Sequence, residues 1–322
     1  MTIDTAFPIF DLARFEAASP LEKRVLGEHI DAICRATGFL AVSGHGVHER
    51  TIGACWTKAE EFFALPTARK QEAKGNPYGY LGYELESLAR SRGVVAPADC
   101  KESFNCGPQH VPEDITDPKA LGFCFARSIW PDAPAGFREA WQAYYAAMED
   151  LATRIMRVFA VALKLPEDFF ESYIHTPVSA LRVLNYPALS MPPKPGQIRA
   201  GAHTDYGSLT ILLPQVGSRG LEILAPGGKW IEIPPRPNAF VINIGDLMAR
   251  WTNDRWVSTV HRVVIPADGG VERRQSLAFF HQPNWDAEIV AIDACLQPKE
   301  APKYPAVHSG PYLMEKFKAT TT

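Results

Sequence analysis

The sequence lacks long apolar runs and any cluster of positive charge. No stretch approaches the length that spans a bilayer, and the N-terminal MTIDTAFPIFDL has no basic segment followed by an apolar one, as a secretory signal has. The 33 Lys and Arg residues are spread among 36 Asp and Glu, which gives a net charge of −3. The sequence therefore shows no basic cluster of the kind that binds nucleic acid or an anionic membrane. We therefore expect a cytoplasmic protein with neither kind of partner.

Cysteine is also scarce. The six cysteines form no C-x-x-C pair and no regular framework. Their spacing argues against a disulfide scaffold and favours reduced, buried thiols. What is present is an ordinary globular composition of 322 residues, 46% hydrophobic and 21% charged. Such a chain has enough apolar side chains for a large core in one large domain or two.

Helix and strand signals alternate in the first half of the chain. Ser19 and Glu22 make a capping-box pattern around Pro20, which predicts the start of a helix. The apolar positions between Pro134 and Leu165 keep spacings of three and four residues, which predicts one long helix. The other expected elements are a strand and turn at 8–15, the capped helix at 21–35, a strand at 38–47, a helix at 50–65 and an aromatic-rich loop at 74–110.

The pattern changes after Pro177. Short runs rich in β-branched and aromatic residues follow one another, with Gly, Pro and Asn between them. The runs lie at 180–186, 209–213, 221–224, 229–233, 239–244, 256–265, 275–281 and 287–292. Seven or eight such strands favour a closed or double-sheet β architecture, and the jelly roll is its most common form with an interior site.

Two strands of this region carry candidate metal ligands. In GAHTDYGSLTILLPQ, His203 and Asp205 are two apart, so on a strand they would face the same side. His261 in STVHRVVIP adds a third ligand from another strand. Two histidines and one carboxylate on one side of a metal are typical of non-haem Fe(II) oxygenases. Taken alone, an H-x-D pattern is weak, because a strand histidine is more often a satisfied polar group.

A candidate anion site lies downstream. Arg274 and Ser276 alternate onto one strand face, and a guanidinium with a hydroxyl suits a carboxylate. By the same alternation Arg182 and Tyr186 share a face of another strand. A guanidinium inside a barrel requires an anionic occupant to balance its charge. These residues therefore predict a small acid bound near the metal.

The C-terminal half contains, in this order, NYP, GAHTDYG, GDLMARWTNDRWVSTVHRV and RRQSLAFFHQPN, and the N-terminal part contains FPIFDL, ATGFLAVSGHGV, EEFFALP and KESFNCG. Over nearly the whole chain these segments resemble the isopenicillin N synthase-like branch of the Fe(II)/2-oxoglutarate-dependent oxygenases. The resemblance implies an α+β fold with a double-stranded β-helix (jelly-roll) core. It places this oxygenase domain at 121–322 and an N-terminal α/β accessory region at 1–120. The long helix between Pro134 and Leu165 is expected, from its apolar spacing, to be a scaffold under a sheet.

The resemblance also implies residue roles. His203, Asp205 and His261 would bind Fe(II). The residues implied for the cosubstrate 2-oxoglutarate are Arg274, Ser276, Tyr186 and Arg182. A structural ion pair is an equal alternative for Arg182. Strand alternation points Asn185 away from Tyr186, which argues against a cosubstrate role for it.

By resemblance the protein hydroxylates or otherwise oxidises a small organic molecule. Decarboxylation of 2-oxoglutarate to succinate is coupled to activation of O2, with ascorbate as a candidate stimulant. Two alternatives stay open. One is an isopenicillin N synthase-like Fe(II) oxidase, or an ethylene-forming-type enzyme, that does not use 2-oxoglutarate in the usual way; the other is a non-enzymatic sensor of a small acid.

Substrate contacts are only weakly indicated by the sequence. The candidates are Tyr80, Arg90, Tyr206 and Phe280, with Tyr78 and Met248 behind them. The first two lie in the aromatic loop NPYGYLGYELESLARSRG, and the next two adjoin the ligand and anion segments. Such residues are more often core or surface than contact. His281 is left out of the metal set because alternation places it opposite Phe280.

Overall fold

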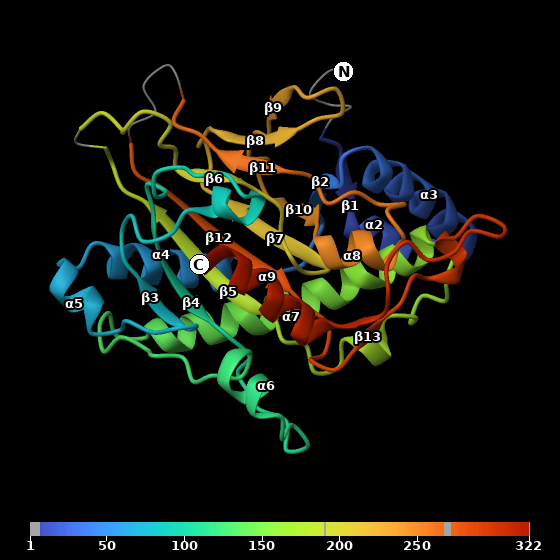
Figure 1. Cartoon of the computed structure of the whole chain (residues 1–322), viewed down its shortest axis with the longest axis horizontal. Helices are drawn as coiled ribbons and strands as arrows, with labels where there is room; N and C mark the ends of the chain where they lie inside the picture. Colours follow the sequence, from blue (N-terminus) through green and yellow to red (C-terminus); the bar gives the residue numbers. More distant parts are fainter. Residues whose placement is uncertain (1–6, 190, 267–271, 322) are drawn as a thin grey trace.

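The computed structural model describes residues 7–189, 191–266 and 272–321, and within them two β-sheets form a jelly roll (Figure 1). The larger sheet has the order β1-β2-β10-β7-β12-β5-β4-β3, and the smaller has the order β6-β11-β8-β9. The strands of the larger sheet are β1 (Ile9–Asp11), β2 (Phe39–Ser43), β10 (Phe240–Ile244), β7 (Leu209–Pro214), β12 (Arg274–His281), β5 (Ala180–Tyr186), β4 (Glu102–Cys106) and β3 (Gly79–Leu81). Those of the smaller are β6 (Ala200–His203), β11 (His261–Val263), β8 (Leu221–Leu224) and β9 (Trp230–Glu232).

Helices lie mainly outside the sheets (Figure 1). The α-helices are α2 (Leu12–Ala17), α3 (Pro20–Ala36), α4 (Glu49–Phe63), α5 (Thr67–Gln71), α6 (Pro118–Phe123), α7 (Phe137–Ala162), α8 (Asp246–Trp251) and α9 (Ser309–Thr321). Three short 3-10 turns, η1 (Leu88–Arg92), η2 (Glu171–Tyr173) and η3 (Asp293–Cys295), and the pair β13 (Glu288–Ile289) and β14 (Val307–His308) complete the described elements. None of these helices is long and apolar enough to cross a membrane.

Helix α7 is the predicted scaffold. Its apolar stripe, including Trp141, Met148 and Leu151, is fully buried in the main core. The ring of Tyr145 packs against that of Phe279 on β12, with the ring centroids 5.2 Å apart. Helices α3 and α4 pack against α7 in turn. The long helix thus supports the outer face of the larger sheet, as its periodicity predicts.

The two faces of β5 and β12 have different roles. Leu181 and Val183 belong to the core shared with α7, whereas Leu184 and Tyr186 belong to a second apolar cluster between the sheets. Strand β12 pairs antiparallel with β5 and places Arg274 opposite Tyr186. Directly paired residues share a face, so Arg274 points inward with Tyr186. The alternate residues that the sequence predicted to share one face of β5 and β12 are therefore the ones that point into the jelly-roll interior.

The N-terminal region completes both edges of the larger sheet. Strands β1 and β2 extend one edge beside β10, and β3 and β4 extend the other beside β5. Strands on both sides of residue 120 thus share one sheet. The domain division at that residue stays a prediction.

Most predicted elements are present, and several need correction. The capping box at Ser19 and Glu22 starts α3 as predicted. The expected loop at 74–110 also contains β3 and β4, which form because partner strands satisfy their backbone. The runs at 256–265 and 287–292 are strands only at β11 and β13, and β13 pairs with β14 outside the two large sheets. Strand β6 is separated from β7 by a loop, so GAHTDYGSLTILLPQ is not one continuous strand.

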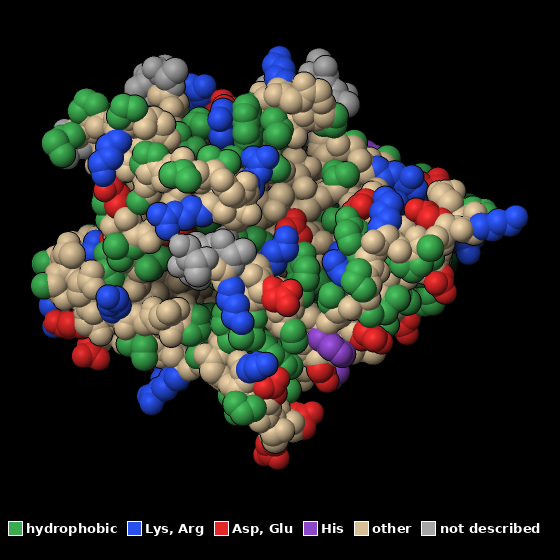
Figure 2. Space-filling model, in the orientation of Figure 1, with side chains coloured by type: hydrophobic (Ala, Val, Ile, Leu, Met, Phe, Trp, Pro, Cys, Tyr) green, Lys and Arg blue, Asp and Glu red, His purple; other side chains and the backbone are tan. Residues whose placement is uncertain are grey.

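Surface charge is mixed, as the composition suggests. On the face drawn in Figure 2, Lys and Arg side chains are interspersed with Asp and Glu. Salt bridges such as Lys23 with Glu167 and Arg154 with Glu16 bring opposite charges together.

Candidate metal and cosubstrate site

The two histidines of the triad lie on neighbouring strands of the smaller sheet. His203 ends β6, and His261 begins β11 directly opposite it. Their rings lie side by side, with centroids 4.4 Å apart. Antiparallel pairing thus brings together side chains far apart in the sequence.

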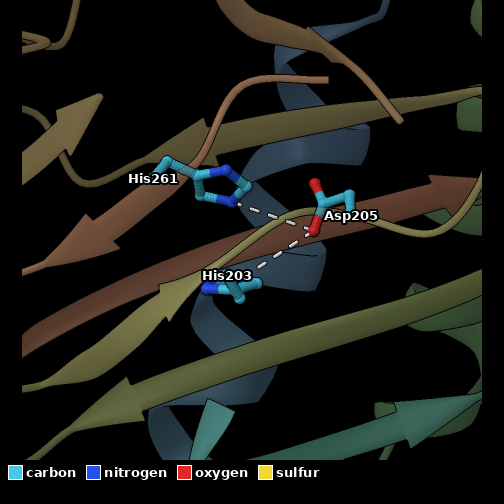
Figure 3. A group of neighbouring side chains, drawn as sticks. All are labelled: His203, Asp205 and His261. Atoms are coloured by element: carbon cyan, nitrogen blue, oxygen red, sulfur yellow. Dashed lines mark ion pairs between the residues drawn. The ribbon is translucent and has the colours of Figure 1, made fainter. Parts of the chain in front are cut away.

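Asp205 reaches the same point by a different route. It lies beyond the end of β6, so the expectation that strand alternation aligns it with His203 is wrong. The loop at 204–207 turns its carboxylate back toward the histidines (Figure 3). Asp205 Oδ1 lies 3.8 Å from Nε2 of His203 and 3.8 Å from Nε2 of His261. One ligand atom of each residue lies within 4.8 Å of the others, which suits a common metal ion.

Hydrogen bonds orient the histidine rings. His203 Nδ1 lies 2.7 Å from the carbonyl oxygen of Gly201, and His261 Nδ1 lies 3.1 Å from that of Thr259. A neutral imidazole that donates from Nδ1 leaves the lone pair of Nε2 free for a metal. Burial first, and then the neighbouring His261, lower the pKa of His203 to about 3. His203 is therefore neutral at physiological pH.

The carboxylate of Asp205 is held from behind. Its Oδ2 accepts hydrogen bonds from Thr210 Oγ1 and, at 2.8 Å, from Asn243 Nδ2, which leaves Oδ1 facing the histidines. Burial raises the pKa of Asp205, but His261, His203 and these two hydrogen bonds outweigh it and lower the pKa. The carboxylate of Asp205 is therefore ionised at neutral pH. Thr210 and Asn243 were missed in the sequence, although each is a polar residue inside an apolar strand.

The loop at 204–207 is clamped by the start of α8. The backbone N–H of Asp246 donates to the carbonyl of Asp205 at 2.7 Å, and that of Leu247 donates to the carbonyl of Gly207 at 3.1 Å. A Cβ on Gly245 would clash with the Gly207 carbonyl oxygen, so only glycine allows this approach. The GDL segment therefore fixes the backbone around the candidate ligand Asp205.

Arg274 lies inside the jelly roll without a balancing charge. It is 3% exposed, and its guanidinium carbon lies 5.0 Å from the ring centroid of Tyr186. Its Nε and Nη1 have no hydrogen-bond partner, and no described carboxylate forms an ion pair with it. Burial lowers the pKa of Arg274, partly offset by Tyr186. Ser276 lies on the same face of β12. A buried guanidinium with unmet donors suits a carboxylate ligand.

Arg182 has a different environment. Its Nε donates to Asn105 Oδ1 at 2.7 Å, and its Nη1 lies 3.2 Å from both carboxylate oxygens of Glu86. Burial raises the pKa of Glu86, but Arg182 and Lys101 outweigh it and hold the pKa far below its ordinary value. The predicted alternative, an ion pair, is thus present in the structure.

The other polar candidates lie apart from the triad. As predicted, Asn185 points to the opposite face of β5, where its amide donates to Glu102 at 2.8 Å. His281 Nδ1 lies 2.7 Å from Ser208 Oγ and does not join the triad. Tyr80 is not brought to the triad either, because it donates to Glu102 and its ring packs against Phe62.

Of the substrate candidates, Phe280 lies on the inner face of β12, in the line of Arg274 and Ser276. Tyr206 follows Asp205 and packs its ring against Phe317 of α9, with centroids 5.5 Å apart. Arg90 is exposed on η1. Tyr78 donates to the carbonyl of Cys124, and Met248 is buried in the main core.

The fold and the triad define a jelly-roll protein with a candidate metal site of two histidines and one carboxylate. The sequence matches the 2OG-Fe(II) oxygenase superfamily at residues 178–283 and the N-terminal region of non-haem dioxygenases in morphine synthesis at residues 7–133. The chain belongs to the 2OG-Fe(II) oxygenase superfamily. It is a 2-oxoglutarate-dependent non-haem Fe(II) dioxygenase.

Relatives cover nearly the whole chain. It is 33% identical to the 2-oxoglutarate-Fe(II) type oxidoreductase hxnY of Emericella nidulans, over 94% of this chain and 87% of the relative. It is 32% identical to the homoarginine-6-hydroxylase 2-ODD-233 of Oryza sativa subsp. japonica, over 89% and 87%.

Solved structures agree in fold. A full-length Neurospora crassa protein in complex with alpha-KG has a TM-score of 0.86 at 29% identity, and the match covers 98% of this chain and 96% of that one. JOX2 in complex with 2OG, Fe and JA has a TM-score of 0.78 at 29% identity, covering 98% and 85%. The jelly-roll core predicted from the sequence is confirmed.

Proposed function

We propose that His203, Asp205 and His261 hold the Fe(II) of this dioxygenase, and that Arg274, Ser276 and Tyr186 hold the distal carboxylate of 2-oxoglutarate. The reaction is hydroxylation, or a related oxidation, of a small organic molecule. The observation that carries the proposal is a pairing of two features inside one jelly roll: a compact triad of ligand atoms and a buried guanidinium with unmet donors.

The donor set fits Fe(II). Two neutral imidazoles and one carboxylate are the ligands of non-haem iron oxygenases, and three protein ligands on one side leave positions for cosubstrate and O2. When bound, Fe(II) with 2-oxoglutarate and O2 supplies the oxidising chemistry. The protein contributes by orientation: the carbonyls of Gly201 and Thr259 set the rings, and Thr210 and Asn243 set the carboxylate.

The cosubstrate fit rests on Arg274. Its orphaned Nε and Nη1 gain partners only from an acceptor that enters the interior, and a carboxylate also balances the buried charge. The adjacent Ser276 adds a hydroxyl on the same strand face. The pairing of β12 with β5 and β7 holds the backbone of this strand in the centre of the larger sheet. Arg274 and Ser276 would therefore orient 2-oxoglutarate with its other end toward the triad.

The relatives' names point to different substrates. One relative is a homoarginine-6-hydroxylase, one structure of the Neurospora crassa protein contains thymine, and the JOX2 structure contains JA. Overall sequence and structural similarity to these proteins therefore does not identify the substrate of this chain. The six cysteines are all free and buried, which supports the proposal of a reducing, cytoplasmic setting. We extend the proposal to an enzyme without nucleic-acid or membrane partners.

The test compares metal binding and turnover in matched variants. Equilibrium dialysis should find one Fe(II) per unaltered chain, none on His261→Ala, and one on His308→Ala, an exposed histidine as control. A substrate screen in air with Fe(II), 2-oxoglutarate and ascorbate should release succinate only from the two chains that bind iron. Retention of iron and of succinate release by His261→Ala would contradict the ligand assignment.

A further inference from the structure

A second polar group lies inside the jelly roll beside the cosubstrate residues. It consists of Glu86, Asp99, Lys101, Asn105 and Arg182, here called the paired cluster. Lys101 Nζ lies 2.8 Å from Glu86 and 3.2 Å from Asp99, and Arg182 contacts Glu86 and Asn105 as described above. The roles proposed for iron and 2-oxoglutarate use none of these contacts.

Strand register places this cluster on the inner face. Arg182 lies opposite Ala278 of β12 on one side and opposite Asn105 of β4 on the other. Ala278 is the residue between Ser276 and Phe280 on that face of β12. Arg182 therefore faces the same interior as the cosubstrate residues. Its pair with Ala278 is the next inward-facing pair of β5 and β12 after that of Leu184 with Ser276.

The cluster also reaches toward the metal strand. Asp99 Oδ1 accepts the backbone N–H of Gly201 on β6 at 2.9 Å, and Oδ2 accepts that of Leu88 at 3.1 Å. Gly201 is close to His203 in the same strand. The cluster thus joins the larger sheet, the η1 turn and the strand that carries His203.

Its charges balance, and two of its members keep accessible edges. Lys101 and Asp99 are buried, with 2% and 3% of their side chains exposed. Arg182 and Glu86 retain 18% and 25%. The guanidinium of Arg182 and the carboxylate of Glu86 therefore lie side by side, and part of each remains accessible to a ligand.

An unmet hydroxyl supports a ligand at this place. Ser103 lies between Lys101 and Asn105 in the sequence and alternates onto their face of β4, opposite Leu184. It is 1% exposed, and its Oγ has no hydrogen-bond partner. A buried hydroxyl without a partner costs free energy that a ligand group can recover.

We propose, on the basis of the function proposed above, that Glu86 and Arg182 recognise the substrate, and that they select a neutral planar group with an adjacent acceptor and donor. A carboxamide, lactam, imide or ureide has this pattern. Its carbonyl accepts from Arg182, its N–H donates to Glu86, and the ring of Phe280 offers a flat apolar surface on the same face.

Other substrate classes fit less well. A carboxylate would meet the negative charge of Glu86, and an ammonium would meet Arg182 and Lys101, because the cluster has no unbalanced charge. A purely apolar group would exclude water from the accessible parts of Arg182 and Glu86 without replacing the hydrogen bonds to water, which costs binding free energy. A neutral group that both donates and accepts avoids these penalties.

The first test uses the unaltered protein loaded with Fe(II) and 2-oxoglutarate without oxygen. Calorimetry compares benzamide, 2-pyridone, benzoate and benzylamine, which are similar in size. We expect benzamide and 2-pyridone to bind about tenfold or more tightly than the two ions, the effect of one or two hydrogen bonds. Equal or tighter binding of either ion, or no binding of either amide, overturns the proposal.

The second test uses variants. Arg182→Gln should weaken 2-pyridone binding about tenfold and change 2-oxoglutarate affinity by less than about twofold. Glu86→Gln should shift preference toward benzoate, because Arg182 and Lys101 then lack a full counter-charge. Arg157→Gln is the control: it removes an exposed ion pair between Arg157 on α7 and Glu171 on η2, and it should change neither property.

The outcomes separate this inference from the function on which it rests. Failure of the unaltered protein to bind Fe(II) or 2-oxoglutarate refutes the proposed function. Normal binding of both, with 2-pyridone binding unchanged in Arg182→Gln, refutes only the role of the paired cluster. A loss of 2-oxoglutarate affinity in Arg182→Gln as large as in an Arg274 variant also refutes it, because Arg182 would then serve the cosubstrate.

Discussion

Two arginines face the interior of this jelly roll from neighbouring strands, and they differ in whether a carboxylate is paired with the guanidinium. Arg274 on β12 is buried without a described carboxylate and has two unmet donors. Arg182 on β5 is already paired with Glu86 and bonded to Asn105. Strand alternation gives both residues the same face, but only the contacts distinguish them. An unpaired buried guanidinium is a site for an anion, whereas a paired one can select a neutral ligand.

The largest effect on activity is expected from a change in the proposed metal ligands, because the roles proposed for both arginines require bound Fe(II). Asp205→Ala removes the one charged ligand and should lower Fe(II) affinity by more than about 100-fold, beyond the effect of losing a supporting hydrogen bond. Succinate release should fall to the iron-free background. Metal titration followed by an oxygen-uptake assay checks both, and near-normal iron affinity would count against the triad.

Next in size is the contrast between the arginines. Arg274→Ala removes a charge-assisted contact of about 1.5–3 kcal/mol, which corresponds to an increase of roughly 10- to 150-fold in the 2-oxoglutarate concentration required. Arg182→Ala should leave that requirement nearly unchanged. Steady-state kinetics with varied 2-oxoglutarate measures both variants. Similar increases in the two would remove the distinction drawn here.

The hydrogen bonds behind Asp205 should have an effect of similar or smaller size. Asn243→Leu leaves Oδ2 of Asp205 with Thr210 alone. Loss of such a supporting contact typically lowers metal affinity by about 10- to 100-fold. The 2-oxoglutarate affinity of the iron-saturated variant should be close to normal. An Fe(II) affinity equal to that of the unaltered protein would show that Asn243 does not support the ligand.

The smallest effect is expected at Ser276. Its hydroxyl would contribute one hydrogen bond to a carboxylate already held by Arg274. Ser276→Ala should therefore raise the 2-oxoglutarate requirement by only about 2- to 12-fold, the equivalent of 0.5–1.5 kcal/mol. The same kinetic assay applies. An effect larger than that of Arg274→Ala would reverse the proposed order of importance.

Periodicity was enough to predict the scaffold helix and the inward faces of β5 and β12, because each depends on the spacing of side chains within one element. The jelly roll was favoured instead by the number of short strands after Pro177 and was implied by the family resemblance. The proposed ligand set was also predicted, from the H-x-D motif and the order in the chain of the segments that resemble the family. The route of Asp205 does not, because a loop rather than a strand orients it, and that loop is held by backbone contacts from α8.

Partners from distant segments could not be predicted. Glu86 lies in an irregular segment between β3 and η1, and no local pattern links it to Arg182. Thr210 and Asn243 come from strands β7 and β10, whose pairing places them together behind Asp205. Lone polar residues in apolar strands were the available signal, but the group that each would meet depends on sheet order.

The most direct test is a crystal structure of the protein with Fe(II) and 2-oxoglutarate bound, in which the position of the distal carboxylate is measured. We expect this carboxylate to lie against the guanidinium of Arg274 and the hydroxyl of Ser276, with Arg182 still paired with Glu86. A carboxylate bound instead to Arg182, with the pair to Glu86 broken, would contradict the account.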